Sequence, residues 1–156
     1  MENKKTYETR MESLSPLISE IVSAGGTVEI TVTGNSMWPM LLHRKSKVRV
    51  ARADNIKIGD IPLYKRENGD YILHRIVDRD ESGYVCSGDH QWQLERGITD
   101  EMIICVVTDF KRRNKWTSCE NKAYKLYRSV WSALRPTRHI IDALKRRVKR
   151  AFCRNQ

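Results

Sequence analysis

The sequence of 156 residues lacks any long apolar run, any paired-cysteine motif and any internal repeat. No stretch reaches the roughly 20 apolar residues that cross a bilayer as a helix, and the polar start MENKKTYETRMES shows no secretory signal. The four cysteines lie far apart and the four histidines show no metal-ligand spacing. We therefore expect no transmembrane segment, no metal and no cofactor, and reduced cysteines in a cytosol-facing protein.

Acidic residues become scarce in the last third of the chain. Residues 111–154 hold fifteen Lys and Arg but only two acids, a net charge of +13, whereas the whole chain carries +10 and the preceding residues sum to −3. Such asymmetry predicts an anionic partner for the basic part. We divide the chain into an N-terminal amphipathic helix (1–26), a near-neutral domain (27–110) and a basic amphipathic helical tail (111–156).

The apolar periodicity predicts a mainly β fold. Short alternating runs separated by Gly, Asn and Asp are typical of antiparallel strands, whereas both ends of the chain repeat at helical spacing. Strands are predicted at 27–33, 47–50, 61–65, 71–77, 83–87 and 102–108, and helices at 5–23, 120–134 and 138–152. The expected fold class is therefore antiparallel β with an N-terminal helix and a basic C-terminal helical extension.

Ser36 stands in a turn directly after the expected strand 27–33. Gly34 permits a tight turn, and Pro39 stiffens the exit three residues later. This arrangement exposes the Ser36 hydroxyl and fixes the N–H beside it, where it can point at a developing oxyanion. The stretch is not the Gly-x-Ser-x-Gly elbow, because Trp38 occupies the second glycine position. On this feature alone, a structural turn serine remains the more common interpretation.

His74 is the best candidate for the base that a serine nucleophile needs. It lies between Ile72 and Ile76 on one strand face, where a buried sheet would otherwise take an apolar residue. A core histidine bonded to the backbone is the alternative. Asp89 follows the expected strand 83–87 and is a candidate to orient the base; the alternative is an ordinary turn aspartate.

Four stretches of the chain, in order, resemble the sequence boxes of type I signal peptidases and their relatives, which include LexA-type self-cleaving repressors. The resemblance covers roughly residues 27–109. Gly34-Asn35-Ser36-Met37-Trp38-Pro39-Met40-Leu41 resembles the G-x-S-M-x-P-x-L nucleophile box, Gly59-Asp60-Ile61 the G-D-hydrophobic box, Leu73-His74-Arg75-Ile76-Val77 the H-R-V/I-V box of the endoplasmic-reticulum and archaeal branch, and Gly88-Asp89 the G-D-N box.

The resemblance implies a serine endopeptidase of the histidine-using branch that cleaves a peptide or protein precursor. Ser36 would be the nucleophile, His74 the general base and Asp89 the supporting acid. Activity would then rise through roughly pH 6–7, the usual histidine range. The family often has a second acid after the G-D-N box, and Glu95 is the nearest here. The neighbours expected to form the oxyanion site and substrate groove are Asn35, Met37, Trp38 and Pro39.

Two other functions fit the same β fold. One is a catalytically silent module that binds a peptide in the groove, although such a module has no chemical reason to keep Ser36, His74 and Asp89 together. The other is a LexA-like regulator, which the single helix before the β domain and the absence of a lysine base disfavour.

The basic tail has three candidate roles: attachment to a membrane surface, binding to nucleic acid or an acidic partner, and solvated helices packed on the domain. Its aromatic residues alternate with apolar residues more than with charges, which favours an anionic membrane surface or an acidic partner protein over nucleic acid. Solvated helices packed on the domain are the third alternative. We expect a cytoplasmic location. The basic tail suggests that the protein could also attach peripherally to the inner face of the membrane.

Overall fold

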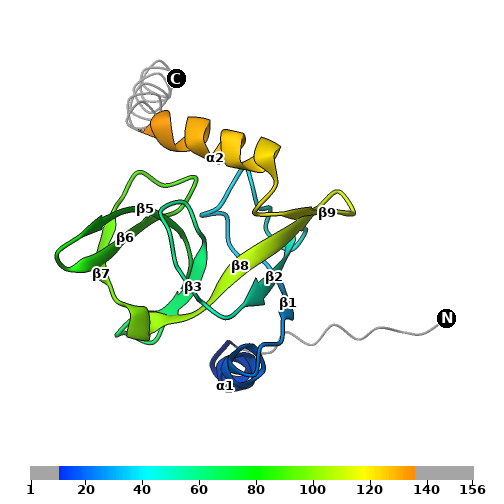
Figure 1. Ribbon diagram of the computed structural model, residues 1–156, viewed down its shortest axis with the longest axis vertical. Helices are drawn as coiled ribbons and strands as arrows, with labels where there is room; N and C mark the ends of the chain where they lie inside the picture. The colour runs from blue at the N-terminus through cyan, green and yellow to red at the C-terminus, as the bar shows by residue number, and fades with distance from the viewer. Residues whose placement is uncertain (1–10, 136–156) are drawn as a thin grey trace, which may run out of the picture.

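The computed structural model describes residues 11–135, which form antiparallel β-sheets flanked by two α-helices (Figure 1). In chain order the elements are α1 (Met11–Ser23), β1 (Val28–Thr31), β2 (Lys47–Ala51), β3 (Pro62–Lys65), β4 (Tyr71–Leu73), β5 (Arg75–Asp80), β6 (Gly83–Ser87), β7 (Glu95–Ile98), the 3-10 helix η1 (Asp100–Met102), β8 (Ile103–Arg112), β9 (Lys115–Ser118) and α2 (Lys122–Ala133). The mainly β fold class expected from the periodicity, with a helix at each end, is confirmed.

The strands form two curled sheets. The six-stranded sheet has the order β1-β2-β8-β3-β4, with β9 paired to β8 off this path, and the three-stranded sheet has the order β5-β6-β7. All the recorded pairings are antiparallel. The long strand β8 contacts β2, β3 and β9, so it is the central support of the larger sheet.

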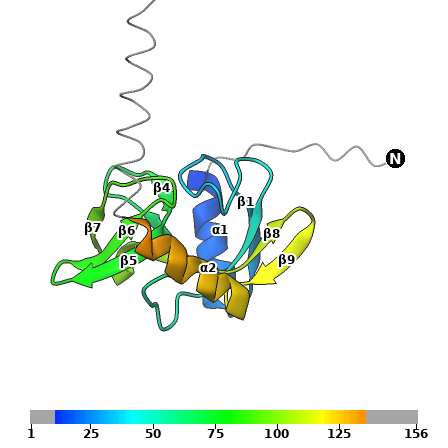
Figure 2. The ribbon, with the colours of Figure 1, turned by 90° about the horizontal axis from the view of Figure 1, so that it is seen from above.

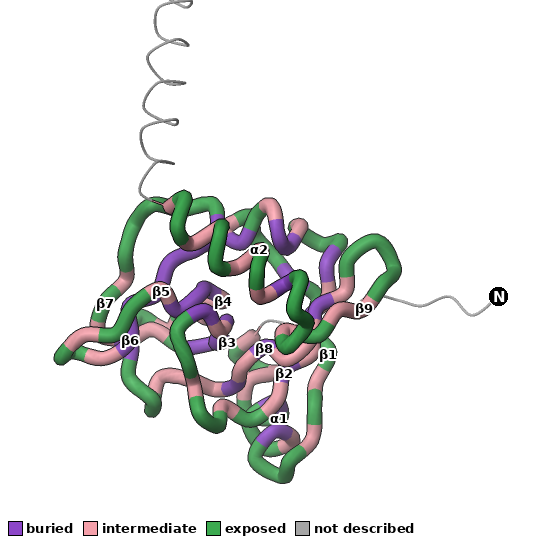
Figure 3. Tube along the Cα trace, turned by 45° about the horizontal axis from the view of Figure 1, so that its top comes forward, coloured by how far each residue is buried: buried purple, intermediate pink, exposed green. Residues whose placement is uncertain are grey.

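Each sheet has its own hydrophobic core. Alternate residues of β2, Val48 and Val50, turn inward and pack with Ile18 and Val22 of α1, which are one helical turn apart. The smaller sheet packs around Tyr64 and a cluster of aliphatic and aromatic side chains. Figure 3 shows the buried stretches running through the middle of the sheets, with exposed stretches on the turns and on much of α2.

The single strand expected at 71–77 is two strands that belong to different sheets. β4 pairs with β3 in the larger sheet and β5 pairs with β6 in the smaller one, and His74 is the one residue between them. The alternation of side chains continues through the junction, which is why the periodicity does not reveal the break.

Two of the strands were not predicted from the sequence. β7 falls in the segment expected to be a long loop. β9 follows a tight turn in which Arg113 and Asn114 both have positive φ, 47° and 65°, the backbone of a two-residue hairpin turn. Its turn lacks the Asn-Gly signal, and β8 with β9 carries the larger sheet past the expected domain boundary at residue 110.

The first helix of the basic tail packs on the β body. Asn121 caps α2 by accepting hydrogen bonds from the N–H groups of Ala123 and Tyr124. The Tyr124 ring is buried, 4.9 Å from the Phe110 ring of β8. Figure 1 shows α2 across one end of the sheets and α1 at the other end, and in the view from above α2 lies in front of α1 (Figure 2). The expected helix at 138–152, like residues 5–10 of the expected first helix, lies outside the described residues.

The buried ring predicts that α2 is part of the folded unit. Tyr124→Ala should lower the free energy of unfolding by about 3–5 kcal/mol, because it removes a packed aromatic side chain and leaves a cavity. Urea denaturation measures the change. Leu126→Ala, two residues away on the exposed side of the same helix, is the matched control and should stay within about 0.5 kcal/mol of the wild type. Equal effects of the two variants would show that α2 is not packed as described.

Candidate active site

The backbone of the turn at Ser36 is held from two sides. Gly34 has a φ of +87°, and its N–H donates to Nδ1 of His43 over 2.8 Å. The carbonyl of Ser36 accepts a hydrogen bond from the N–H of His90 over 2.7 Å. A Cβ atom on Gly88 would lie 2.6 Å from the Ser36 carbonyl oxygen, so the close approach of the two loops requires glycine there.

The four expected neighbours of Ser36 lie in different environments. Met37 is buried and lines the same cavity as Ser36. Asn35 is exposed, and its carbonyl accepts from the N–H of Trp38. The Trp38 side chain is 46% exposed and meets the ring of His90 edge-on, outside the cavity lining; the peptide bond between Trp38 and Pro39 is cis.

Ser36 and His74 line one cavity of about 270 Å³. Its other walls come from residues 32–34 directly after β1, from β4, and from the side chains of Arg66 and Gln91. Within residues 11–135 no hydrogen bond joins the Ser36 hydroxyl to the His74 ring. Contacts of this kind often form only when substrate closes the site.

Two backbone N–H groups at Ser36 are left without an acceptor in the described part of the chain. Within the described part of the chain, the N–H groups of Ser36 and Met37 donate to no protein acceptor. A free N–H next to a nucleophilic hydroxyl is the arrangement that stabilises the oxyanion of an acyl-transfer intermediate. The turn therefore supplies both a hydroxyl and a donor at the same place.

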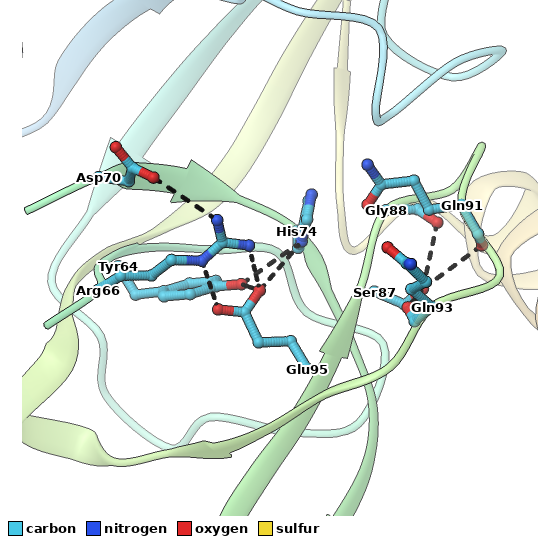
Figure 4. Close-up of polar contacts among 9 residues, drawn as sticks. All are labelled: Tyr64, Arg66, Asp70, His74, Ser87, Gly88, Gln91, Gln93 and Glu95. Atoms are coloured by element: carbon cyan, nitrogen blue, oxygen red, sulfur yellow. Dashed lines mark hydrogen bonds and ion pairs between the residues drawn. The ribbon is translucent and has the colours of Figure 1, made fainter. Parts of the chain in front are cut away.

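The His74 ring is buried at the junction of the two sheets, and one of its nitrogens faces a tyrosine and a glutamate. Nδ1 lies 3.4 Å from the hydroxyl oxygen of Tyr64 and 3.8 Å from Oε2 of Glu95. In Figure 4 the dashed lines join this nitrogen to both residues, while the other ring nitrogen points away from them. The second nitrogen, Nε2, is thus left outside this contact.

The polar network determines the tautomer of His74. The Tyr64 hydroxyl donates its only proton to Glu95 over 2.7 Å, so its oxygen can interact with His74 only as an acceptor. Nδ1 therefore carries the ring proton, and Nε2 holds the lone pair that a general base uses. Burial, followed by the hydrogen bond to Glu95, raises the pKa of Tyr64 and keeps its proton in place.

The His74 ring is neutral well below pH 7. Burial lowers its pKa to about 4, and the nearby carboxylate of Glu95 opposes that shift without overcoming it. This replaces the pKa of roughly 6–7 expected for an unperturbed histidine. The ring is therefore in its unprotonated form over the physiological pH range.

Glu95 is held as a carboxylate by Arg66. Burial raises the pKa of Glu95, but the hydrogen bonds from Arg66 and Tyr64 outweigh it, so the pKa lies below its usual value. Arg66 binds both carboxylate oxygens, through Nε at 2.6 Å and Nη2 at 2.7 Å. Glu95 is the first residue of β7, and it is the acid that approaches the His74 ring.

Asp89, the expected supporting acid of His74, instead forms a buried ion pair with Arg75. The Arg75 guanidinium donates to both carboxylate oxygens, at 2.8 Å and 2.7 Å, and both side chains are buried. Because His90, the next residue, donates to the Ser36 carbonyl, this ion pair anchors the loop of Ser36, and the Asp89 charge also favours the protonated form of the His74 ring. The structure thus gives Asp89 a different partner from the expected one.

Arg75 is the residue that sequence reasoning missed. Its remaining N–H groups donate to the carbonyl of Gly59, the hydroxyl of Tyr124 and the sulfur of Met40, over 2.9, 2.9 and 3.0 Å. An arginine inside an apolar strand was the available signal, since a buried cation requires a nearby acid. No local pattern shows which acid that is.

The loop after β6 is tied to its surroundings on both sides. The Ser87 hydroxyl donates to the carbonyl of Gln93 over 2.7 Å, with longer contacts to those of Gly88 and Gln91 (Figure 4). From α2, the indole N–H of Trp131 donates to the carbonyl of Asp89 over 3.3 Å. The loop that holds Ser36 is therefore supported by the fold on one side and by α2 on the other.

The chain was compared with models of protein families, with curated proteins and with solved structures, and none of the three comparisons gave a match. Among residues 11–135, no group of three or more His, Cys, Asp or Glu side chains is placed to hold a metal ion. No helix in that part of the chain is long and apolar enough to cross a membrane.

The buried ion pair predicts a large loss of stability on Asp89→Asn. The substitution leaves the Arg75 charge buried without its partner, and the free energy of unfolding should fall by about 3–5 kcal/mol. Asp80→Asn is the control: it breaks an ion pair with Arg96 at the surface and should leave the denaturation midpoint nearly unchanged. If the two variants unfolded at the same denaturant concentration, Asp89 would not be the anchor described here.

The burial of His74 predicts a histidine that titrates near pH 4. We expect its ring signals in a proton NMR titration to shift at about pH 4, whereas exposed histidines shift near pH 6.5. His74→Gln assigns the signal by removing it. Glu95→Gln should lower the pKa further, since the carboxylate favours the charged ring. A His74 titration near pH 6.5 would contradict the buried, neutral base.

Proposed function

We propose that the protein is a serine endopeptidase of the signal-peptidase type, with Ser36 as nucleophile and His74 as general base. One observation carries the proposal: Ser36 and His74 line the same cavity. The four sequence boxes, in the family's order, support the same assignment.

The reaction is acyl transfer in two steps. Nε2 of His74 accepts the proton of the Ser36 hydroxyl while Oγ attacks the scissile carbonyl carbon. The N–H groups of Ser36 and Met37 stabilise the oxyanion, and the C–N bond breaks as the His74 proton passes to the leaving amine. Water, deprotonated by His74, then hydrolyses the ester and restores the Ser36 hydroxyl.

The supporting acid in this proposal is Glu95. Tyr64 stands between the His74 ring and the carboxylate, so the contact runs from Nδ1–H to the tyrosine oxygen and from the tyrosine O–H to Glu95. The carboxylate, 3.8 Å from Nδ1, stabilises the imidazolium that forms during attack. Glu95 is also the acid that lies nearest after the G-D-N-like box in the sequence.

The cavity suits an extended peptide. β1 and β4 are the two outer strands of the path through the larger sheet, and residues of β4 and residues directly after β1 both line the cavity. An outer strand presents backbone N–H and C=O groups on its unpaired side. A peptide lying between the two would form main-chain hydrogen bonds there, while side chains such as Met37 and Leu73 receive its own side chains.

The proposal predicts peptide cleavage that depends on Ser36. Wild-type protein, incubated with a diverse peptide library and analysed by mass spectrometry, should produce new termini, and Ser36→Ala and His74→Ala should each reduce them by at least about a thousandfold. Ser19→Ala, an exposed serine on α1, is the matched control and should cleave as the wild type does.

Two outcomes would contradict the proposal. Peptides that bind in the cavity but stay intact would instead support the silent peptide-binding module. Cleavage that survives Ser36→Ala would show that a different group carries the chemistry.

A further inference from the structure

The outward side of α2 is apolar. Leu126, Val130 and Leu134 recur every four residues along the helix and are 68%, 50% and 49% exposed. Residues at this spacing form one stripe on a helix surface. The opposite side of α2 carries Tyr124 and Trp131, which pack on the β body. We call the exposed stripe the outer ridge.

Such a ridge reverses the usual pattern of a surface helix, whose outward side is polar. Two of the three charged side chains of α2 are paired elsewhere: Arg128 pairs with Asp60 of the body, and Lys125 pairs with Glu120 before the helix. An exposed apolar stripe on an otherwise packed helix marks a contact surface.

Two more exposed apolar side chains lie beside the end of α2. Trp92 and Leu94, in the loop after β6, are 55% and 45% exposed. Arg135, directly after the helix, donates to the carbonyl of Trp92 over 3.4 Å, which places the loop next to the C-terminal end of the outer ridge. The apolar surface therefore reaches the loop whose residue Gln91 lines the cavity.

The chain that follows α2 is strongly basic. Residues 136–156 contain seven Lys and Arg and one acid, a net charge of +6, and five large apolar residues are distributed among them. A partner of this region must therefore offer both an apolar interior and negative charge. Nucleic acid provides the negative charge but offers no apolar interior in which an exposed aliphatic ridge could be buried. A second copy of the chain would bring two strongly positive segments together.

We propose that the outer ridge of α2 docks on an anionic lipid surface, to which the net positive charge of the sequence after the helix is complementary. Aliphatic side chains enter the boundary between headgroups and acyl chains, and Lys and Arg contact the headgroups. Trp92 lies at the same surface, where its amphipathic ring is favoured. This docking does not rest on the proposed peptidase activity, because none of the residues involved takes part in the chemistry.

Vesicle flotation of the full chain tests the docking. The Ser36→Ala protein serves as background, so that hydrolysis cannot affect the result. It should float with vesicles of phosphatidylcholine and phosphatidylserine but stay at the bottom with phosphatidylcholine alone, and added salt should weaken the binding. Val130→Glu at the centre of the ridge should lower the partition coefficient of the protein onto anionic vesicles at least about tenfold.

Leu17→Glu is the matched control. Leu17 is 53% exposed and Val130 is 50% exposed, and Leu17 lies on α1 at the other end of the molecule (Figure 1). The substitution Leu17→Glu introduces the same charge as Val130→Glu. It should float as the background protein does, and thermal denaturation checks that both variants fold.

Several results would overturn the docking. These are absence of flotation with anionic vesicles, equal flotation with neutral ones, and equal losses in Val130→Glu and Leu17→Glu. Self-association that Val130→Glu abolishes, measured by sedimentation without lipid, would assign the ridge to a second copy. If truncation after residue 135 made the ridge accessible to chemical labelling, the partner of the ridge would be this chain's own C-terminal segment.

Discussion

The buried ion pair between Arg75 and Asp89 joins the parts of the molecule that form the candidate site. A guanidinium has five N–H donors, and here each has an acceptor: two bind Asp89, and the others reach Gly59, Tyr124 and Met40. A buried charge is tolerated only when it is paired and its donors are satisfied. The turn before β3, the strand after His74, the loop after β6, the nucleophile loop and α2 must therefore all be in place together.

The ion pair and the histidine network have separate tasks. The pair acts on the loop of Ser36, because the residue after Asp89 donates to the Ser36 carbonyl. The network of Tyr64, Glu95 and Arg66 acts on His74, because it favours one position for the ring proton. His74 and Arg75 are consecutive, so one peptide bond connects the two systems. Two acids can therefore lie near Ser36 and His74 without binding the same ring nitrogen.

Local patterns were sufficient for part of the fold and part of the site. The period-2 runs predicted most strands of the larger sheet, and the turn at Ser36 together with the strand histidine predicted the pair that shares the cavity. They failed where a residue's role depends on a distant partner. β7 reads Glu-Arg-Gly-Ile, with no apolar alternation, so the strand was not predicted, and neither were the contacts of Glu95 with Tyr64 and Arg66.

The same limit applies to His74 and Asp89. Continuous alternation through residues 71–77 conceals that the chain passes from one sheet to the other at His74, because hydrogen-bonding partners, not side-chain direction, change there. Gly88-Asp89 resembles the G-D-N box of the family, yet Arg75 donates hydrogen bonds to both carboxylate oxygens of Asp89. Which of two nearby acids faces a histidine follows from tertiary packing that no single-sequence pattern contains.

The neutral, buried state of His74 has a consequence for how such a site is controlled. With a pKa of about 4, the ring is mostly unprotonated between pH 5 and 8, so its charge changes little over that range. In the proposed peptidase, control would then depend on access to the cavity that Ser36 and His74 share.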